Sequence, residues 1–189
     1  MITATKEDKA LIIHILSESF KENKSILFVI KNDSKQKERI QKLMEYSYNM
    51  ALSSGEIFLS ENKKGCVLLL YSCKKPPFLK QLKYDLDLAI NCIGLTQIFK
   101  VLKREKQIKL QHPKHSFLHL WYIGVNPNDQ GKNIGRNLMK EVLAFAQKKN
   151  KNIYLETSTH SNIKFYEKLG FRRYHTIKNI GFNLFMFRN

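Results

Sequence analysis

Apolar residues recur along the N-terminal half of the chain at spacings that change from helical to extended. A short strand is predicted at residues 2–4, and the helix after it places Leu11, Ile12, Ile15 and Leu16 on one face. Residues 34–52 repeat this helical pattern. After Gly55, the stretches Ile57–Ser60 and Cys66–Ser72 are extended and apolar, and a polar run ending at Gly65 separates them. This half therefore predicts helices followed by a β-hairpin.

The C-terminal half predicts alternating helices and strands. After the break at Pro76 and Pro77, residues 78–110 have a helical pattern in two pieces joined near Gly94. Helices are also predicted for 131–150 and for 161–170, which stops at Gly170. Strands are predicted for 116–125, 152–157, 172–178 and 182–187. The order of elements predicts an α/β fold with a mixed sheet.

Length and composition agree with a folded domain. The chain has 189 residues, and 43% of them are hydrophobic, which is enough for a sizeable core. We therefore interpret residues 1–189 as a single domain. The formal net charge is +17, but the lysines are scattered, which is typical of solvated faces. A basic helical face formed by Lys100, Lys103, Arg104 and Lys106 has the same interpretation, with nucleic-acid contact as the alternative.

The cysteines and the N-terminal segment give information on the cellular compartment of the protein. Cys66, Cys73 and Cys92 are odd in number and lack CxxC spacing, so we expect free thiols in a reducing compartment. The apolar run at residues 11–16 is too short for a signal sequence or a membrane span. These features predict a soluble, cytoplasmic protein with no membrane partner.

One loop has the composition of an anion-binding site. The sequence "NPNDQGKNIGRNLM", residues 126–139, lies between a predicted strand and a predicted helix. Backbone N–H groups at a helix start attract anions, and small residues allow close approach. The stretch lacks the spacing of a Walker A loop and the G-x-G-x-x-G of a dinucleotide fold. A pyrophosphate cradle at 130–136 and an ordinary strand–helix turn both remain open.

Three motifs together indicate a family. "VNPNDQGKNIG", "YLETS" and "NIKFYEKLGF" resemble, in order and distance, the motifs of the GNAT superfamily of acetyl-CoA-dependent N-acetyltransferases. The stretch "HLWYIGVNPNDQGKNIG" is similar, more narrowly, to the branch that contains puromycin N-acetyltransferase. The resemblance covers residues 116–172 closely, while the N-terminal half agrees in its order of elements. It implies a GNAT-like central mixed sheet that is splayed and flanked by helices, with acetyl-CoA as cosubstrate and no metal.

The resemblance also implies which residues bind acetyl-CoA. The strand ending at Val125 would bulge and splay from 153–156, and Gly124 fits a bulge or a close backbone approach. Asn133 stands where the family has glycine, and asparagine tolerates left-handed dihedral angles well. Asn162 matches a family asparagine and also suits a helix N-cap. The full set implied for the cosubstrate is Ile123, Gly124, Val125, Gln130, Gly131, Lys132, Asn133, Ile134, Gly135, Arg136, Asn162, Phe165 and Tyr166.

Three residues are candidates for the chemistry. Tyr166 matches the family position of the general acid that protonates the coenzyme A thiolate, although its helical spacing also suits a core residue. His119 is the candidate general base, since an imidazole has an unperturbed pKa of about 6.5. Glu156 would orient water or the amine, or pair with a cation. Trp121, two residues after His119, would share its face or belong to the core.

The function expected is transfer of acetyl from acetyl-CoA to a primary amine of a small molecule or peptide by direct attack. Residues 1–115 would form mainly the acceptor side, 116–172 the acetyl-CoA motifs, and 173–189 the closing strands. The alternatives are a non-catalytic acyl-CoA sensor and a nucleic-acid-associated acetyltransferase acting on charged tRNA. The protein would be a monomer or a homodimer.

Overall fold

The computed structural model describes residues 1–178 and 180–189. The N-terminal half contains one short strand, three helices and a hairpin. These elements are β1 (Ile2–Thr3), α1 (Lys9–Phe20), α2 (Lys24–Val29), α3 (Gln36–Ser54), β2 (Gly55–Leu59) and β3 (Gly65–Tyr71). The sequence pattern did not predict α2, because a six-residue apolar run does not reveal its period. The other predicted elements of this half are confirmed.

The rest of the chain follows the predicted order. Two helices joined at Gly94 precede a strand, and strands and helices then alternate. The elements are α4 (Phe78–Leu88), the π-helix η1 (Ala89–Ile93), the 3₁₀-helix η2 (Leu95–Gln97), α5 (Ile98–Gln111), β4 (Leu118–Val125), the 3₁₀-helix η3 (Pro127–Asp129), α6 (Ile134–Lys148), β5 (Ile153–Thr157), α7 (Ser161–Glu167), β6 (Arg172–Ile177) and β7 (Leu184–Arg188). Gly94 and Gly170 have left-handed φ angles, which suit the helix ends predicted there.

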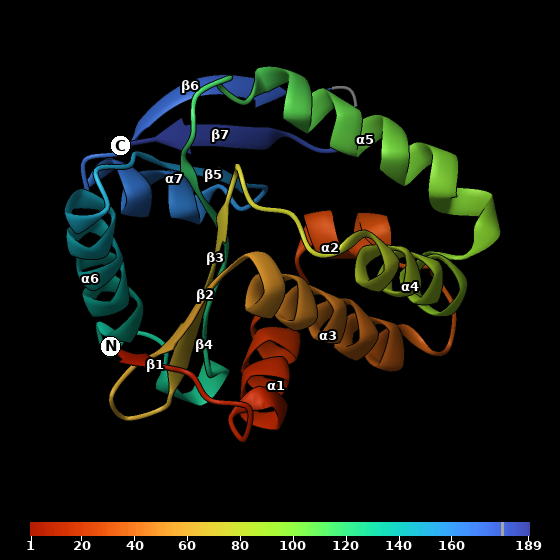
Figure 1. Ribbon diagram of the computed structural model, residues 1–189, viewed down its shortest axis with the longest axis horizontal. Coiled ribbons are helices and arrows are strands. Elements are labelled where there is room, and N and C mark those ends of the chain that lie inside the picture. Colours follow the sequence, from red (N-terminus) through yellow and green to blue (C-terminus); the bar gives the residue numbers. More distant parts are fainter. Residues whose placement is uncertain (179) are drawn as a thin grey trace.

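In the part of the chain that the structure describes, the strands form one seven-stranded sheet in the order β1-β2-β3-β4-β5-β7-β6. Its pairs are antiparallel except β4 with β5, which run parallel. The mixed α/β prediction is therefore confirmed. Figure 1 shows α6 and α7 on one face of the sheet, and α1 and α3 on the other. Because successive side chains of a strand point to opposite faces of the sheet, they alternate between these two groups of helices.

The described residues form two large apolar cores, one on each face of the sheet, and a smaller cluster of Ile108, Ile177, Ile180, Leu184 and Met186. The α1–α3 core contains Ile12, Leu16, Met44 and Tyr48, and the strands β2 and β3 contribute Leu59 and Leu68 to it. The α6 core is built from Leu138, Met139 and Val142 of α6, together with strand residues such as Leu120, Leu155 and Phe187. Because strands of both halves of the sheet contribute to the α6 core, that core joins the two halves.

The parallel strands β4 and β5 pair over a short length. Within the described residues, their register contains only Leu118 opposite Ile153 and His119 opposite Tyr154. Both strands continue beyond these pairs, to Val125 and Thr157. The splayed sheet is therefore confirmed, and the backbone of each strand has an edge without a strand partner beyond His119 and Tyr154.

A β-bulge lies in β4, as the family resemblance implied, but it is at Trp121 and not at Gly124, for which a bulge and a close backbone approach were both open. Leu69 is opposite Leu120 and Leu68 is opposite Tyr122, so Trp121 is the extra residue. The bulge reverses the alternation of side chains, because Leu120 lies in the α6 core and Tyr122 in the α1–α3 core. Gly124 instead allows close packing, since a Cβ there would lie 3.1 Å from Leu16 Cδ2 and from Ser19 Oγ.

The segment from α4 to α5 is inserted between β3 and β4 and reaches away from α6 (Figure 1). The predicted basic face of α5 needs one correction. Arg104 is only 9% exposed and forms an ion pair with Glu105, whereas Lys100, Lys103 and Lys106 are exposed. Among the described residues, none of the helices has the length and apolar character needed to cross a membrane.

Candidate active site

His119 and Glu156 meet where β4 and β5 separate. His119 occupies the last paired position of β4, and Glu156 lies two residues after its partner Tyr154 on β5. Residues two apart on a strand share a face, so Glu156 points to the same side as Tyr154. The Nε2 atom of His119 lies 2.7 Å from Oε2 of Glu156. The structure thus brings together the candidate base and the candidate orienting carboxylate.

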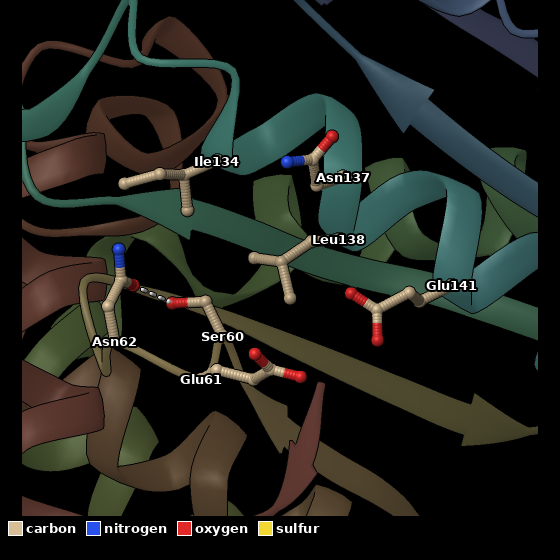
Figure 2. Close-up of a pocket in the computed structure, with 7 residues that line it drawn as sticks. All are labelled: Ser60, Glu61, Asn62, Ile134, Asn137, Leu138 and Glu141. Atoms are coloured by element: carbon tan, nitrogen blue, oxygen red, sulfur yellow. Dashed lines mark hydrogen bonds between the residues drawn. The ribbon is translucent and has the colours of Figure 1, made fainter.

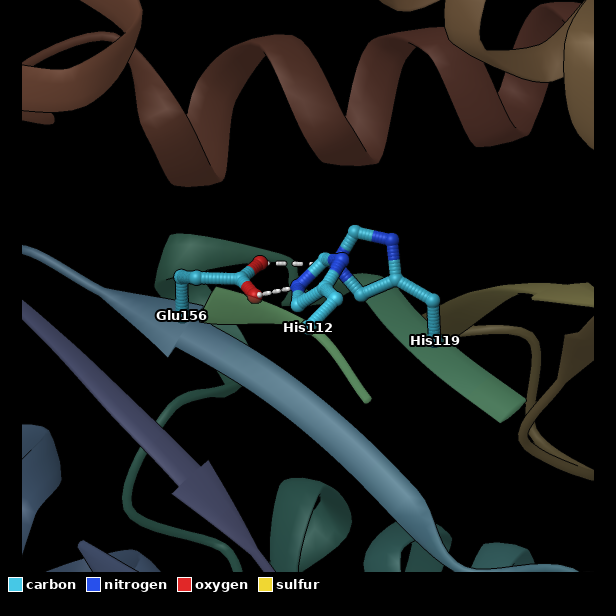
Figure 3. Close-up of side chains that lie close together, drawn as sticks. All are labelled: His112, His119 and Glu156. Carbon is cyan, nitrogen blue, oxygen red and sulfur yellow. Dashed lines mark hydrogen bonds and ion pairs between the residues drawn. The ribbon is translucent and has the colours of Figure 1, made fainter. Parts of the chain in front are cut away.

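A third residue, His112, completes this cluster and was not predicted. Its Nε2 lies 2.6 Å from Oε1 of Glu156, so the carboxylate contacts both imidazoles, one through each oxygen (Figure 3). His112 directly follows α5, and α5 positions it over the sheet. Its closeness to His119 in the sequence was the one available signal. The contact with Glu156 spans 44 residues and depends on the tertiary fold.

The electrostatics of the cluster follow from burial and mutual attraction. Burial favours neutral His119, but the charge of Glu156 and the hydrogen bond to it outweigh this effect and raise the His119 pKa. Burial also favours neutral Glu156, yet the neighbouring His119 and His112 hold the pKa of Glu156 well below its usual range. Glu156 is therefore a carboxylate at neutral pH.

This charge state fixes the histidine tautomers. A carboxylate only accepts hydrogen bonds, so the Nε2 atoms of His112 and His119 must each carry a hydrogen. When His119 is neutral, its lone pair is consequently on Nδ1, on the other side of the ring from Glu156. A carboxylate that orients an imidazole in this way makes the opposite nitrogen a better proton acceptor.

The same three residues have the ligand types of a metal site. One ligand atom from each of His112, His119 and Glu156 lies within 4.8 Å of the other two. Two imidazoles and a carboxylate are ligands that zinc accepts. In the present arrangement, however, each imidazole donates to one carboxylate oxygen, so the polar groups of the cluster satisfy one another.

Tyr166 lies in the α6 core, on the helix that follows β5. Its ring packs against Phe165, Phe171 and Phe187, and the side chain is 5% exposed. Tyr166 is therefore a core residue by its packing, which was one of the two interpretations of its helical spacing. Burial, and secondarily the charge of Glu156, raise the pKa of the phenol. The hydroxyl consequently retains its proton at neutral pH, as an acid requires before it donates.

The loop before α6 adopts left-handed backbone at two positions. Gly131 has φ +79° and Asn133 has φ 62°, and Asn133 is the residue immediately before α6. The prediction that asparagine would accept this conformation is confirmed. The Asn133 side chain makes no capping hydrogen bond. The first N–H groups of α6 also have no acceptor within the helix, so they can donate to an anion.

Cationic and aromatic groups border a cavity near this helix start. A cavity of about 220 Å³ is lined by Arg136 of α6 and by Phe165, Lys168 and Leu169 of the α7 region. A ring and two cations suit a ligand that combines a planar base with phosphates. Lys132, in contrast, does not line this cavity. Its Nζ lies 2.7 Å from Oδ1 of Asp129, with which it forms an ion pair.

The end of β4 is held by internal hydrogen bonds. The carbonyl oxygen of Val125 accepts from Ser19 Oγ at 2.8 Å and from Gln130 Nε2 at 3.3 Å. Gln130 therefore ties the loop to the strand that precedes it. Ile123 lies between Gly124 and the bulge and packs against the α6 core.

Asn162 is not the helix N-cap, which was one of the two roles that the sequence suggested for it. α7 begins at Ser161 with His160 before it, so Asn162 lies inside the first turn and is not the N-cap. Its Nδ2 donates to Thr157 Oγ1 at 3.3 Å, which links α7 to the end of β5. Trp121 packs edge-on against Tyr46 next to the α1–α3 core, which favours its core interpretation.

A second cavity lies on a different side of α6. It measures about 260 Å³, and the β2–β3 turn and α6 line it with Ser60, Glu61, Asn62, Ile134, Asn137, Leu138 and Glu141 (Figure 2). The Glu61 carboxylate would repel phosphates there, and Glu141 is already paired with the N-terminal ammonium group. Because Ile134 lines this cavity, its side chain points away from the cationic cavity at Arg136.

Comparison with known proteins agrees with the fold. Residues 92–173 match the family described as the acetyltransferase (GNAT) domain. A histone acetyltransferase and related acetyltransferase of Corynebacterium glutamicum is 18% identical, with a TM-score of 0.71, over 99% of this chain and 93% of that one. The polyamine N-acetyltransferase of Drosophila melanogaster is 14% identical, with a TM-score of 0.62, over 99% and 97%. Arylalkylamine N-acetyltransferase 2 of Aedes aegypti is 13% identical, with a TM-score of 0.65, over 100% and 96%. At these identities the structural likeness establishes the fold, which is that of GNAT proteins.

Proposed function

We propose that the protein is an acetyl-CoA-dependent N-acetyltransferase that acetylates a primary amine of a small molecule or peptide. The observation that carries this proposal is the His119–Glu156 pair at the point where β4 and β5 separate. The match of residues 92–173 to the GNAT domain supports it, and so do similar folds in enzymes named for polyamines and arylalkylamines. Membership of the puromycin N-acetyltransferase branch stays a prediction.

His119 is the proton acceptor in this proposal. An amine must lose a proton to attack near neutral pH, and an oriented imidazole can accept it. With Nε2–H donated to Glu156, the free lone pair of His119 is on Nδ1. Glu156 stabilises the imidazolium that forms, and His112 holds Glu156 by its other oxygen. The three residues thus have separate tasks: accepting the proton, stabilising the charge and fixing the carboxylate.

Tyr166 is the proton donor. Acetyl-CoA supplies an acetyl thioester, and its thiolate leaving group benefits from a proton. The raised pKa of Tyr166 keeps the phenol protonated until then. Asn162, in the first turn of the same helix, donates to Thr157 at the end of β5, so α7 begins beside the stretch of β5 that β4 leaves unpaired. This placement supports a donor that reaches the gap between the two strands.

The chain also offers groups suited to the rest of acetyl-CoA. The left-handed loop at Gly131 and Asn133 presents the start of α6, which favours a pyrophosphate. Arg136, Phe165 and Lys168 line the adjoining cavity with charges and a ring that suit a phosphorylated nucleoside. The unpaired edges of β4 and β5 suit an extended amide-bearing arm. Ile123, Gly124 and Val125 lie on that stretch of β4.

An acceptor panel tests the function directly. Purified protein is incubated with acetyl-CoA and one amine at a time, and coenzyme A release is followed with a thiol reagent. Polyamines, arylalkylamines, aminoglycoside-type amines and short peptides form the panel. Release that requires the amine and falls sharply in His119→Ala supports the proposal. Binding of acetyl-CoA without amine-dependent release from any class would favour the acyl-CoA sensor instead.

A further inference from the structure

Exposed large apolar side chains are concentrated in one segment of the chain. Among the described residues, all of them except Ile2 and Leu52 lie on the segment from α4 to α5: Phe78, Leu79, Leu82, Leu86, Ile90, Leu95, Phe99, Leu102 and Leu110. Phe78 is 77% exposed and Phe99 is 83% exposed. A protein surface rarely groups so many apolar side chains without a partner. We call these residues the α4–α5 apolar surface.

On α4 the apolar residues form a stripe that faces away from the body. Phe78, Leu82 and Leu86 are four residues apart, so they follow one side of α4, and Ile90 continues the same spacing into η1. The opposite side attaches α4 to the protein, through Leu88 at the α1–α3 core and through Asp85, which accepts from the Tyr46 hydroxyl at 2.8 Å. α4 has no buried residue, so the helix covers little of the core.

On α5 the inward side is equally well defined. Val101 and Ile108 are buried, and the Arg104 guanidinium bonds to Ser25 and lies 5.9 Å from the Phe28 ring. Rotating α5 to hide Phe99 and Leu102 would expose this buried face. The apolar surface is therefore a consequence of how the two helices are attached, and covering it requires a partner.

The exposed charged residues around the apolar surface are mostly basic. The exposed basic residues of the segment are Lys80, Lys83, Lys100, Lys103, Lys106 and Lys109, and the exposed Lys74, Lys75 and Lys114 flank it in the sequence. Its acidic residues are Asp85 and Asp87, which are exposed, and Glu105, which pairs with Arg104. A second copy of the chain would bring a like-charged surface against this one, in a protein whose formal net charge is +17. The partner should therefore be anionic.

Whether the basic residues are lysines or arginines helps to distinguish a lipid bilayer from a protein as the binding partner. Lysine is depleted from protein–protein interfaces, whereas arginine is enriched there. The exposed cations of this segment are all lysines, and its one arginine, Arg104, is buried. Amphipathic helices that lie on anionic membranes combine lysines with exposed Phe and Leu, and lysine side chains reach from the apolar layer to the headgroups. This composition favours a bilayer.

We propose that the α4–α5 apolar surface docks on an anionic lipid bilayer, with Phe78 and Phe99 entering the boundary between headgroups and acyl chains and the flanking lysines contacting lipid phosphates. The inference is separate from the proposed acetyltransferase function, since neither phenylalanine belongs to the His112–His119–Glu156 cluster. It replaces the sequence-based expectation that the protein has no membrane partner.

Vesicle co-sedimentation of the full chain tests this docking. Vesicles of phosphatidylcholine with an equal part of phosphatidylglycerol should bind the protein, and vesicles of phosphatidylcholine alone should bind it at least about tenfold more weakly. Binding should also weaken as salt is added, because screening reduces the lysine contribution. Phe78→Glu together with Phe99→Glu should reduce binding at least about tenfold, as should Lys80→Glu with Lys83→Glu.

Leu52→Glu is the matched control, because Leu52 is a 53% exposed leucine on α3, outside the segment. This variant should bind vesicles like the unchanged protein. Circular dichroism and acetyl-CoA-dependent thermal shift of each variant show whether it is folded. Equal binding by the Phe78 and Phe99 variant, or equal loss in Leu52→Glu, would overturn the proposal. So would a sedimentation-velocity dimer that Phe78→Glu dissociates, since the surface would then be a self-association interface.

Discussion

Glu156 connects the residues of the candidate site at the scale of single side chains. It accepts from His112 and His119 through different oxygens and is close enough to influence Tyr166. Its charge raises the pKa of both the proposed base and the proposed acid. Neutralising it should therefore lower the basicity of His119 and the pKa of Tyr166 together.

The pH dependence of turnover reports this coupling. The proposed base acts when His119 is neutral, so kcat/KM should rise with pH through a pKa that Glu156 has displaced above the ordinary value of 6.5. In Glu156→Gln the inflection should move to lower pH, because the carboxylate charge is gone and burial remains. Two amines of different basicity serve as the control, since an inflection of His119 stays in place between them. An inflection that follows the amine would contradict the assignment.

The same pKa shifts affect folding stability with opposite signs. The raised pKa of His119 gives stability that is fully present below pH 6.5 and is lost as pH rises through the folded-state pKa. The lowered pKa of Glu156 gives stability that is present above pH 4.5 and is lost as pH falls through the folded-state pKa. The contribution of the pair is therefore largest at mildly acidic pH, between these two limits.

Removing the Tyr166 hydroxyl should separate chemistry from binding. We expect Tyr166→Phe to lower kcat by roughly 100-fold or more, the usual contribution of a general acid, while acetyl-CoA affinity stays close to normal. The ring remains packed against Phe171 and Phe187, so the fold should tolerate the change. Steady-state kinetics and calorimetric titration of acetyl-CoA measure the two effects. Unchanged turnover would refute the acid role.

Asn133 offers a gain-of-affinity test. Its φ of 62° lies in the left-handed region, where glycine is less strained than asparagine. Asn133→Gly should therefore preserve or tighten acetyl-CoA binding, measured as Kd by calorimetry. Gly131→Ala is the converse control: open space surrounds a Cβ there, so any loss of affinity comes from the φ of +79°. A clear loss in Asn133→Gly would mean that the asparagine side chain itself contacts the ligand.

The sequence predicted the site best where it lies on regular elements. His119, Glu156 and Tyr166 each occupy a strand or helix whose period is visible in the sequence, and motif order placed them. His112 was missed because it lies in a connecting segment, where local pattern does not determine which distant side chain it meets. The hydroxyl that donates to the Val125 carbonyl oxygen likewise comes from a distant part of the chain, because Ser19 on α1 lies more than a hundred residues away in the sequence.

At the scale of elements, close backbone packing at β2 gives a stability test. A Cβ at Gly55 would lie 1.8 Å from the Leu69 carbonyl oxygen, so Gly55→Ala must displace β2 from β3. We expect the free energy of unfolding to fall by about 3 kcal/mol or more. Gly135→Ala is the matched control, because its Cβ would meet Val125 at an ordinary 3.5 Å and alanine favours a helix. Urea denaturation compares the two, and equal stabilities would contradict the packing argument.

Three element-scale features could not be predicted from the sequence pattern, for physical reasons. The bulge at Trp121 depends on how β3 and β4 align, and neither strand alone records that alignment. Gly124 marked an unusual position correctly, but a glycine serves a bulge and a close contact equally well, and the contact with α1 was the correct alternative. Short α2 also lacked a readable period.

At the scale of the molecule, cosubstrate binding should stabilise the entire fold. The α6 core contains residues from both β3 and β5, so a ligand held between α6 and α7 rests on both halves of the sheet. Acetyl-CoA at 100 times its Kd should add about 2.7 kcal/mol to the free energy of unfolding. Differential scanning calorimetry should show a higher Tm with acetyl-CoA, and free acetate is the control. An unchanged Tm at saturation would contradict native-state binding.

The distribution of charge also belongs to this scale. The +17 net charge alone predicted solvated lysines, and that pattern could not reveal that apolar side chains accompany them on α4 and α5. Those side chains have helical spacing, which in a sequence normally indicates an inward face. Only the folded attachment of the two helices shows that the stripe points outward.

The short pairing of β4 with β5 has a consequence for the order of events during turnover. Beyond His119 and Tyr154 the two strands have unpaired edges, and the extended arm of acetyl-CoA can hydrogen-bond to them. Once the arm is bound between the strands, it forms one side of the site in which the amine binds. We expect acetyl-CoA to bind first and the amine second. Deuterium exchange should then slow in 120–125 and 155–157 with acetyl-CoA alone and should remain fast with the amine alone. The gap between β4 and β5 would thus stay open until acetyl-CoA binds in it. The order of substrate addition would then follow from the backbone hydrogen bonds that the two strands leave unmade.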